Sequence, residues 1–387
     1  MADPKDKVLD SLISDFEKIH PEVKVDAQYV GNYDVLLQKI LASVAAGNPP
    51  DMSQVYENWT TRLKDANAIV PVQNFIDQNG FTKEDIKDIY PIFISNNSYD
   101  KTIWTFPFNK SIYVYYYNAS MFRKYGVTPP RNMEEFREVC RRLTRKDKNG
   151  KITQYGFGFR ANIDVFAILF YMNKGKFFSD DGTKAVFNDS TGKETLQFIL
   201  DMVNNEKIAY YTKDYLDNDF ASGRMASFFA TNPHRNYLEP LLSFPLGVAP
   251  LPAGKIQVAP IAGTNVAIFA KKDGNAGKRQ EACWQFMKWL TSTDGTVKWV
   301  IGTSYLPIRK SALKNQTMQD YLKKQPLDMI AIKQLDNAVT DPRVKIWQEV
   351  RIYVGEALEK ALLGKATASA ALDEAAKKVN DLLEKNK

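Results

Sequence analysis

The sequence PFNKSIYVYYYN, residues 107–118, is the stretch that decides the fold. Most of it is a run of aromatic and β-branched residues, which is typical of a buried strand. Its beginning, however, carries three polar residues side by side, Asn109, Lys110 and Ser111. Buried polar groups are costly unless they are hydrogen-bonded, so packing alone does not explain this triplet.

The bulk composition indicates a folded protein with two domains. The chain has 387 residues, which is long for one hydrophobic core, and 44% of them are hydrophobic. The net charge of +7 is spread among acidic residues without the basic stripe of a nucleic-acid-binding protein. We therefore expect no nucleic-acid partner and a mildly cationic surface that aids capture of an anionic ligand.

Few residues are available for redox or metal chemistry. Cys140 and Cys283 lie in helical patterns and are interpreted as small buried apolar residues, with a single disulfide as the alternative. Two histidines, His20 and His234, cannot assemble a zinc cluster, and we expect no metal and no cofactor. The sequence contains no stretch of transmembrane length and no signal peptide.

Strand and helix patterns alternate at the start of the chain. The segment VKVDAQYV (23–30) alternates like a half-buried strand, GNYD (31–34) opens a helix, and DMSQVYE (51–57) is a short strand. This order favours an α/β lobe with a largely parallel sheet. Further strands are expected in APIAGTNVAIFAKK (259–272), and the chain ends in amphipathic helices.

Motifs for catalysis are missing from the sequence. It has no P-loop, serine elbow or HExxH, and QYGFGFR (154–160) lacks the third glycine of a dinucleotide loop. Spacing cannot settle whether two acidic residues are opposed as in a glycosidase, so an enzyme acting on phosphorylated or glycosidic substrates stays open as an alternative. We expect a protein that is not an enzyme.

Four segments resemble a known family. GNYDVLLQKILASVAAGNPPDMSQVYE (31–57), PFNKSIYVYYYN (107–118), SYLPIRKSAL (304–313) and VRIYVGEALEKALLGKATASAAL (350–372) are similar to corresponding runs of ABC-transporter extracellular solute-binding proteins, especially those for sn-glycerol 3-phosphate. The resemblance implies an α/β, two-lobed, periplasmic-binding-protein-like fold of type II, with interleaved lobes joined by hinge strands.

The lobe boundaries expected from this resemblance are residues 1–110 and 264–308 for lobe 1, and 111–263 and 309–387 for lobe 2. The family's first strand has no counterpart here, because Met1 aligns with an internal methionine of the family. We therefore hypothesise that the first strand of lobe 1 and a secretion signal are missing from this chain, and that lobe 1 has an empty strand position.

The resemblance also implies ligand contacts. In the second lobe the family's tryptophan-rich wall is replaced by FGFRANIDVFAI (157–168), which leaves the size of the ligand and its phosphate substituent open. The register of the hydroxyl-bearing turn within 231–234 is also open. Residues on ligand positions are Tyr33, Glu57, Ser111, Asn232, Gly263, Tyr305 and Arg351, with Lys110, Thr231 and Arg235 as additional candidates.

Two of these residues suit a phosphorylated polyol chemically. Arg351 has a planar guanidinium that can bind phosphate in bidentate fashion, although a surface ion pair with Glu349 or Glu356 is the structural alternative. Glu57, at the end of a strand, can accept hydrogen bonds from two hydroxyls. Gly263 either lets its backbone N–H approach phosphate or marks a strand bulge.

The implied function is that of the substrate-binding subunit of an ABC importer, which binds sn-glycerol 3-phosphate between two lobes that close over it. A sugar or a glycerophosphodiester such as glycerophosphocholine is the alternative ligand. The resemblance further implies ABC permease subunits as partners, a monomer, and a periplasmic or cell-surface location. Under this reading the strand at 107–118 crosses between lobes, which gives its polar triplet a role in the ligand site.

Overall fold

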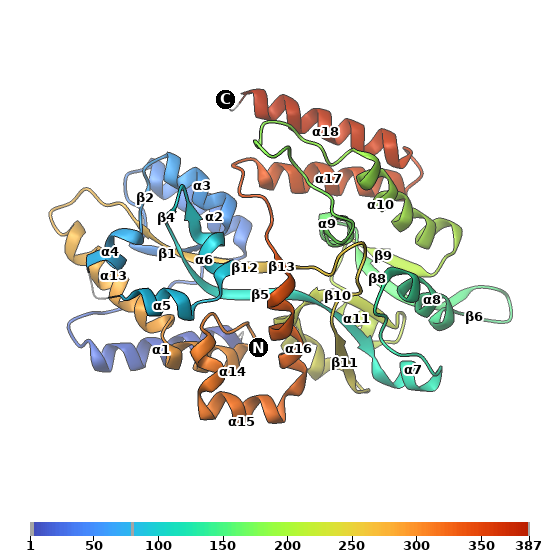
Figure 1. Cartoon of the computed structure of the whole chain (residues 1–387), viewed down its shortest axis with the longest axis horizontal. Helices are drawn as coiled ribbons and strands as arrows, with labels where there is room; N and C mark the ends of the chain where they lie inside the picture. Colours follow the sequence, from blue (N-terminus) through green and yellow to red (C-terminus); the bar gives the residue numbers. More distant parts are fainter. Residues whose placement is uncertain (1–3, 79–80, 386–387) are drawn as a thin grey trace. The chain divides into compact units, whose positions relative to one another are not determined.

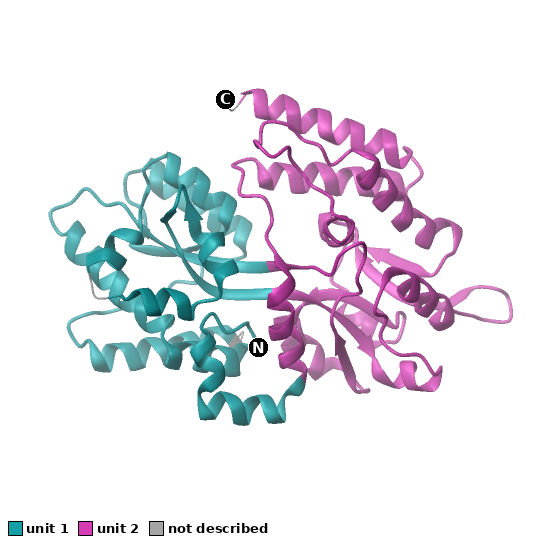
Figure 2. Ribbon diagram, viewed as in Figure 1, with its two compact units in different colours: residues 1–111, 262–326 teal, residues 112–261, 327–387 magenta. Residues whose placement is uncertain are grey.

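The computed structural model describes residues 4–78 and 81–385 of the chain. The protein consists of two compact units, each assembled from two separate stretches of sequence (Figure 2). Unit 1 contains residues 1–111 and 262–326, and unit 2 contains residues 112–261 and 327–387. Helices and strands occur together in both units (Figure 1), which confirms the α/β class.

Three elements carry the chain from one unit to the other. The long strand β5 (Phe106–Asn118) passes the boundary after Ser111, as the family resemblance implied. Strand β12 (Ala259–Phe269) returns into unit 1, and helix α16 (Pro326–Lys333) leads out again. Residues 309–326 therefore lie in unit 1, whereas the second lobe was expected to begin at 309. Hydrogen bonds from Ser311 and Arg309 to Asp88 hold this segment in unit 1.

Unit 1 has helices around a small sheet. Strands β1 and β2 both pair antiparallel with β12, so the expectation of a largely parallel sheet is wrong for these pairings. Strand–helix alternation does not determine direction, because β12 enters the unit from a distant part of the sequence. The helices are α1 (Pro4–Ile19), α2 (Tyr33–Ala45), α3 (Glu57–Asp65), α4 (Gln73–Gln78), α5 (Lys83–Asp88), α6 (Pro91–Asn97), α13 (Ala276–Leu290), α14 (Thr293–Thr303) and α15 (Gln316–Lys324). The short strands are β1 (Met52–Val55), β2 (Ile69–Val70), β3 (Ser98–Tyr99) and β4 (Thr102–Ile103).

The segment VKVDAQYV does not form the strand that its alternation predicts. Residues 23–30 have no regular secondary structure, and Tyr29 is 83% exposed. The backbone N–H of Val25 instead donates to the side chain of Glu17 on α1. Strand β1 pairs with β12 on one side, and no strand in the described part of the chain pairs with its other side. Alternation produces a strand only where a neighbouring strand can pair with it.

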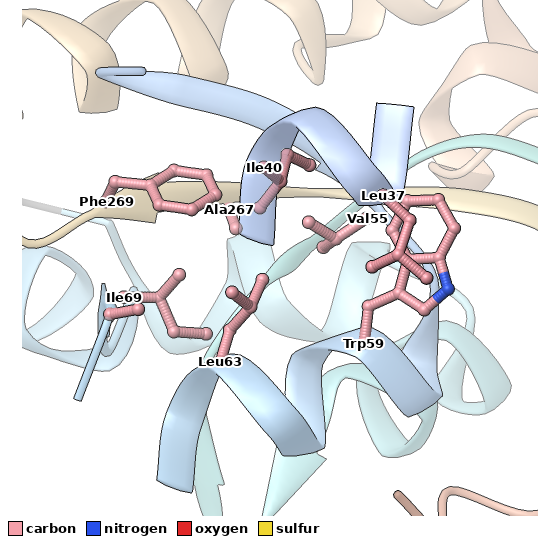
Figure 3. Packing of buried hydrophobic residues seen from close by; sticks show 9 residues of the cluster. Leu37, Ile40, Val55, Trp59, Leu63, Ile69, Ala267 and Phe269 are labelled. Carbon is pink, nitrogen blue, oxygen red and sulfur yellow. The ribbon is translucent and has the colours of Figure 1, made fainter. Parts of the chain in front are cut away.

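The core of unit 1 lies between α2, α3 and the sheet (Figure 3). Leu37 and Ile40 of α2 meet Leu63 of α3 and Phe269 of β12 there, all of them at most 6% exposed. A buried side chain of this size contributes roughly 1.5–3 kcal/mol relative to an exposed one. This packing fixes the beginnings of α2 and α3, where Tyr33 and Glu57 stand.

Unit 2 is a mixed sheet covered by helices. Strand β5 pairs antiparallel with β10 and β11, whereas β8 runs parallel to both β9 and β10. Strands β8, β9 and β10 therefore end at the same edge of the sheet. The helices are α7 (Ala119–Lys124), α8 (Met133–Leu143), α9 (Ile163–Met172), α10 (Ser190–Leu200), α11 (Asp217–Ala221), α12 (Arg235–Leu238), α17 (Trp347–Leu362) and α18 (Ala368–Lys385). The strands are β6 (Arg145–Lys146), β7 (Ile152–Gln154), β8 (Phe157–Arg160), β9 (Ala209–Thr212), β10 (Ser227–Thr231), β11 (Leu246–Ala249) and β13 (Ala338–Val339).

Helix α9 is the central helix of unit 2. It is apolar on nearly every side and packs against α10, α17 and β8. Its beginning is capped by Asn162, whose side chain accepts a hydrogen bond from the backbone N–H of Asp164. The cap and the surrounding packing hold Asp164 at the edge where β8 and β10 end, which is where ligands bind in many α/β folds.

Candidate ligand-binding site

Unit 1 contains a buried polar cluster centred on Lys110, which we call the Lys110 cluster. The Lys110 side chain is fully buried, and its Nζ lies 2.8 Å from Glu57 Oε1. The same nitrogen donates to Asn96 Oδ1 at 3.0 Å, to Asn265 Oδ1 at 3.2 Å and to the carbonyl of Gly263 at 3.4 Å. An ammonium has three N–H donors, so these acceptors satisfy it fully. Lys110 is thus a structural cation that orients Glu57.

A second network beside it organises the start of β5. Asn109 donates to the Tyr33 hydroxyl and to Gln54 Oε1, each at 3.3 Å. Its side-chain oxygen accepts from the backbone N–H and the hydroxyl of Thr264 on β12. The hydroxyl of Tyr33 is therefore fixed from two strands, while its ring stays half-buried. Three of the predicted site residues of unit 1 (Tyr33, Glu57 and Lys110) are held by these two networks.

Gly263 is explained by backbone geometry. Its φ is +88°, and an added Cβ would lie 1.9 Å from the carbonyl oxygen of Asn109. The close approach of β12 to β5 thus requires glycine here, which supports the bulge interpretation of this residue. The carbonyl that this geometry turns inward is the one that accepts from Lys110.

Tyr305 and Ser111 complete the set in unit 1. The loop after α14 is tied to β5 by the hydrogen bond from the N–H of Leu306 to the carbonyl of Lys110, 2.8 Å long. Tyr305 therefore stands beside the Lys110 cluster, half-buried, with its ring 6.0 Å from that of Trp299. Ser111 is only 3% exposed and follows directly in β5.

Unit 2 contains a second charged cluster, which we call the Arg351 cluster. The guanidinium of Arg351 on α17 donates to Asp164 at 2.7 Å and to Asp341 at 3.4 Å. Asp341 also accepts from the Tyr171 hydroxyl at 3.0 Å and from the Trp347 indole at 3.1 Å. The ion pair with Glu349 or Glu356 considered from helix spacing is replaced by these two partners from other parts of the chain.

Burial and neighbouring charges shift the pKa values of Asp341 and Arg351 in this cluster. Burial raises the pKa of Asp341 above its usual value, and the nearby Arg351 only partly opposes this effect. Burial also disfavours the cation, yet Asp164 and Asp341 outweigh it and raise the pKa of Arg351. The Arg351 side chain is 33% exposed, so it keeps N–H groups for a further acceptor.

The other three predicted residues of unit 2 have different surroundings. Asn232 is 5% exposed, and its side-chain oxygen accepts from the backbone N–H of Ile112 at 2.9 Å. Arg235 is 3% exposed and forms an ion pair with Asp328 at 3.1 Å. Both side chains therefore support the fold around β5 and α16. Thr231, at the end of β10, lines a cavity.

This cavity lies within unit 2 at the edge where β8 and β10 end, and its volume is about 160 Å³. Aromatic rings from β8 and β10 form much of its wall, together with the beginning of α9. The polar residues of the wall are Tyr113, Arg160, Asn162, Asp164, Thr231 and His234. Its position joins it to the Arg351 cluster, because Asp164 belongs to both.

Several residues of these clusters were missed by the sequence reasoning. Asn96, Asn265 and Gln54 carried no signal, since an isolated amide in a helix or strand is common. Asp164 could have been noticed, because it follows an Asn cap at the start of an apolar helix. Asp341 lies in an irregular segment without any motif.

Cys140 and Cys283 are free thiols, so the disulfide alternative is wrong, and burial raises the pKa of Cys283 to about 12. Within residues 4–78 and 81–385, no group of three or more His, Cys, Asp or Glu side chains could hold a metal ion. In the same residues, no helix combines the length and apolar character needed to span a membrane.

The two α/β units, each built from separate stretches of sequence and joined by shared strands, have the fold of solved solute-binding proteins. The chain belongs to the family of bacterial extracellular solute-binding proteins, whose model matches residues 3–297. This confirms the family assignment made from the four sequence segments.

Relatives and solved structures agree with this assignment. The chain is 28% identical to the sn-glycerol-3-phosphate-binding periplasmic protein UgpB of Pectobacterium atrosepticum, over 97% of this chain and 88% of the relative. It is 27% identical to UgpB of Escherichia coli K12, over 97% and 89% of the two chains. UgpB of Mycobacterium tuberculosis in complex with glycerophosphocholine has a TM-score of 0.86 at 21% identity, covering 99% of this chain and 96% of that chain. The GacH receptor of Streptomyces glaucescens, solved unliganded and with acarbose, has a TM-score of 0.82 at 20% identity, covering 99% and 96%.

Proposed function

We propose that this chain binds a glycerol phosphate, either sn-glycerol 3-phosphate or a phosphodiester of it, and delivers it to the permease subunits of an ABC importer. The observation that carries the proposal is the arrangement of Arg351, which is oriented by two carboxylates yet one-third exposed. A guanidinium held in this way can donate its remaining N–H groups to a phosphate as a planar pair.

Unit 1 contains residues that suit the glycerol part of such a ligand. Glu57 is fixed by Lys110, and its carboxylate is 15% exposed, so it can accept hydrogen bonds from glycerol hydroxyls. The half-buried ring of Tyr33 offers an apolar face for the glycerol carbons, and Tyr305 offers another. In this proposal Ser111, Gly263 and Asn232 shape the backbone around these groups. The proposal also places the protein outside the cytoplasmic membrane, as a binding subunit without catalytic activity.

A neutral sugar is the second candidate ligand. The observation that favours it is charge compensation, because Lys110 and Arg351 are both already paired with carboxylates. The GacH receptor, which has the same fold, was solved in complex with acarbose, a ligand of a different class.

Calorimetric titration with sn-glycerol 3-phosphate, glycerophosphocholine and maltose separates these ligands. We expect saturable heat from at least one phosphate ligand and none from maltose. Binding of maltose without binding of either phosphate ligand would show that the phosphate assignment is wrong.

Two variants then connect binding to the Lys110 cluster. Glu57→Gln removes the charged acceptor and should weaken binding about tenfold or more, as expected for a hydrogen bond to a charged group. Glu84→Gln is the matched control, because Glu84 is 79% exposed and its ion pair is with the exposed Lys87. Equal affinity in both variants would exclude Glu57 from the ligand site.

A further inference from the structure

Arg160 is an arginine in the unit 2 cavity that has no ion pair with an acidic group of the described residues. It is the last residue of β8 and lines the cavity together with Asp164, Thr231 and His234. Its guanidinium carbon lies 4.3 Å from the centre of the Tyr215 ring, which covers one face of the planar group. Its Nε is buried and has no hydrogen-bond partner.

The other arginines near this edge of unit 2 are all paired. Arg351 is held by two carboxylates, and Arg235 is held by Asp328. Among the residues that the structure describes, by contrast, no carboxylate oxygen lies within 4.0 Å of a nitrogen of Arg160.

Asp164 in this wall and Asp217, which follows the wall residue Leu216, already have partners. Asp164 binds Arg351 at 2.7 Å, and Asp217 lies 2.9 Å from the ring of His234. Although burial raises the pKa of Asp217, the hydrogen bond from His234 and the charge of His234 hold it below its usual value, with a smaller contribution from the charge of Arg160. Arg160 therefore contributes a positive charge to this wall without a direct ion pair.

An unpaired buried donor is costly, about 1–3 kcal/mol for each group. Such groups are rare in native proteins and call for an explanation. The unpaired Nε of Arg160 is explained if its acceptor belongs to a molecule that binds in the cavity. Arg160 stands at the shared carboxyl edge of β8, β9 and β10, where ligands of α/β folds bind. A guanidinium with one stacked face presents its donors at the edge, which suits an anionic oxygen.

We propose that Arg160 donates to the phosphate of the ligand and determines the preference for an anionic over a neutral ligand. In this proposal Arg351 orients the ligand, and the positive charge of Arg351 is offset by Asp164 and Asp341. The net positive charge that meets the phosphate comes from Arg160. This inference rests on the proposed function, since it presupposes a ligand that carries phosphate.

The test is calorimetry with sn-glycerol 3-phosphate on the full chain and on Arg160→Gln. We expect the variant to bind about 10- to 100-fold more weakly, the range for a hydrogen bond between charged groups. Its affinity should also depend less on salt concentration than that of the original chain, because a charge pair is lost. Arg145→Gln is the matched control, since Arg145 also stacks on a tyrosine of unit 2, with 3.7 Å to the ring of Tyr125, but does not line the cavity. Its affinity should not change.

The possible outcomes separate the two proposals. If the original chain binds none of the phosphate ligands, the proposed function is wrong. If it binds sn-glycerol 3-phosphate and Arg160→Gln binds equally well, only the role of Arg160 is wrong. Should Arg160→Gln unfold, Arg160→Lys keeps a charge in place. Affinity of the lysine variant equal to that of the original chain, with an unchanged salt dependence, would show that the planar donor set of Arg160 makes no contact with phosphate.

Discussion

The Lys110 cluster and the Arg351 cluster each hold a cation beside acidic side chains, but they differ in burial and in the number of carboxylates. Lys110 is fully buried and shares one carboxylate with amide and carbonyl oxygens. Arg351 is one-third exposed and lies between two carboxylates, which leaves an excess of negative charge. Both clusters hold a cation firmly, but only the second keeps water-accessible donors.

The difference indicates distinct roles. Amides satisfy a buried ammonium without adding charge, so the Lys110 cluster stabilises unit 1 and fixes Glu57 at one place. Carboxylates beside an exposed guanidinium restrict its orientation but also reduce its positive charge. Unit 1 therefore holds a carboxylate in a fixed position, whereas unit 2 holds a partly exposed guanidinium between two carboxylates. The following predictions test this contrast.

The largest effect is expected from Lys110→Met. The substitution leaves Glu57 and three oxygen acceptors in a buried position without their cation. Removal of one partner of a buried ion pair costs about 3–5 kcal/mol, and we expect that loss in the free energy of unfolding measured by denaturant titration. Lys87→Met is the control, because Lys87 is 75% exposed and should change stability by less than about 0.5 kcal/mol. A similar result for both variants would mean that the cluster does not stabilise unit 1.

The next largest effect is expected from Gly263→Ala. The added Cβ would meet the carbonyl of Asn109 at 1.9 Å, and the backbone conformation at φ +88° is itself unfavourable for alanine. We expect a loss of at least about 2 kcal/mol, because strain and a backbone collision act together. Gly364→Ala separates the two causes, since Gly364 has φ +69° and no atom within 4 Å of its added Cβ. If Gly364→Ala is equally destabilising in the same unfolding measurement, the close approach of β12 to β5 is unimportant.

A smaller effect is expected from Arg351→Gln. Two carboxylates lose their cation, but solvent reaches this cluster and screens them. We expect a loss of about 1–2 kcal/mol in the free energy of unfolding, clearly less than for Lys110→Met. In the background of Asp341→Asn the cost of Arg351→Gln should fall, because one of the unpaired charges is already gone. A cost as large as that of Lys110→Met would contradict the distinction between the two clusters.

Much of the fold could be predicted from the sequence. The strand at 107–118 was predicted by its aromatic run, and the family resemblance implied that it passes between two parts of the molecule. The helices near the C-terminus were predicted by their apolar periodicity. The prediction of a strand at residues 23–30 was wrong, because the sequence pattern does not reveal whether a neighbouring strand exists. The prediction of parallel strands in unit 1 was wrong for a related reason, since β12, with which β1 pairs antiparallel, comes from a distant segment of the sequence.

The candidate site was predictable only in part. Family resemblance pointed to Glu57 and Arg351, but their partners are tertiary contacts that no local spacing reveals. Arg351 meets Asp164 and Asp341 because α17 packs against α9, whereas helix periodicity suggested Glu349 and Glu356. Likewise, nothing in the triplet 109–111 indicates that Lys110 is wholly internal to unit 1.

The smallest effect concerns the dependence of stability on pH. Burial raises the pKa of Asp341, so the folded protein holds this proton more tightly than the unfolded chain. The resulting stabilisation is complete below the unfolded pKa, near 3.8, and is lost as pH rises through the higher folded pKa. The pKa of Asp217 is shifted in the opposite direction, below its usual value. Burial opposes ionisation there too, but the hydrogen bond from His234 lowers its pKa, and the resulting stabilisation is lost as pH falls.

Two variants measure this difference in sign. Between about pH 7 and pH 3, which lies below the unfolded pKa of both carboxyl groups, the original chain should gain free energy of unfolding relative to Asp341→Asn and lose it relative to Asp217→Asn. Denaturant titration of the three proteins at both pH values gives the two slopes. Slopes of the same sign would mean that the surroundings of one of the two carboxyl groups do not shift its pKa in the stated direction. Such a result would contradict burial as the main influence on the pKa of Asp341, or His234 as the group that lowers the pKa of Asp217.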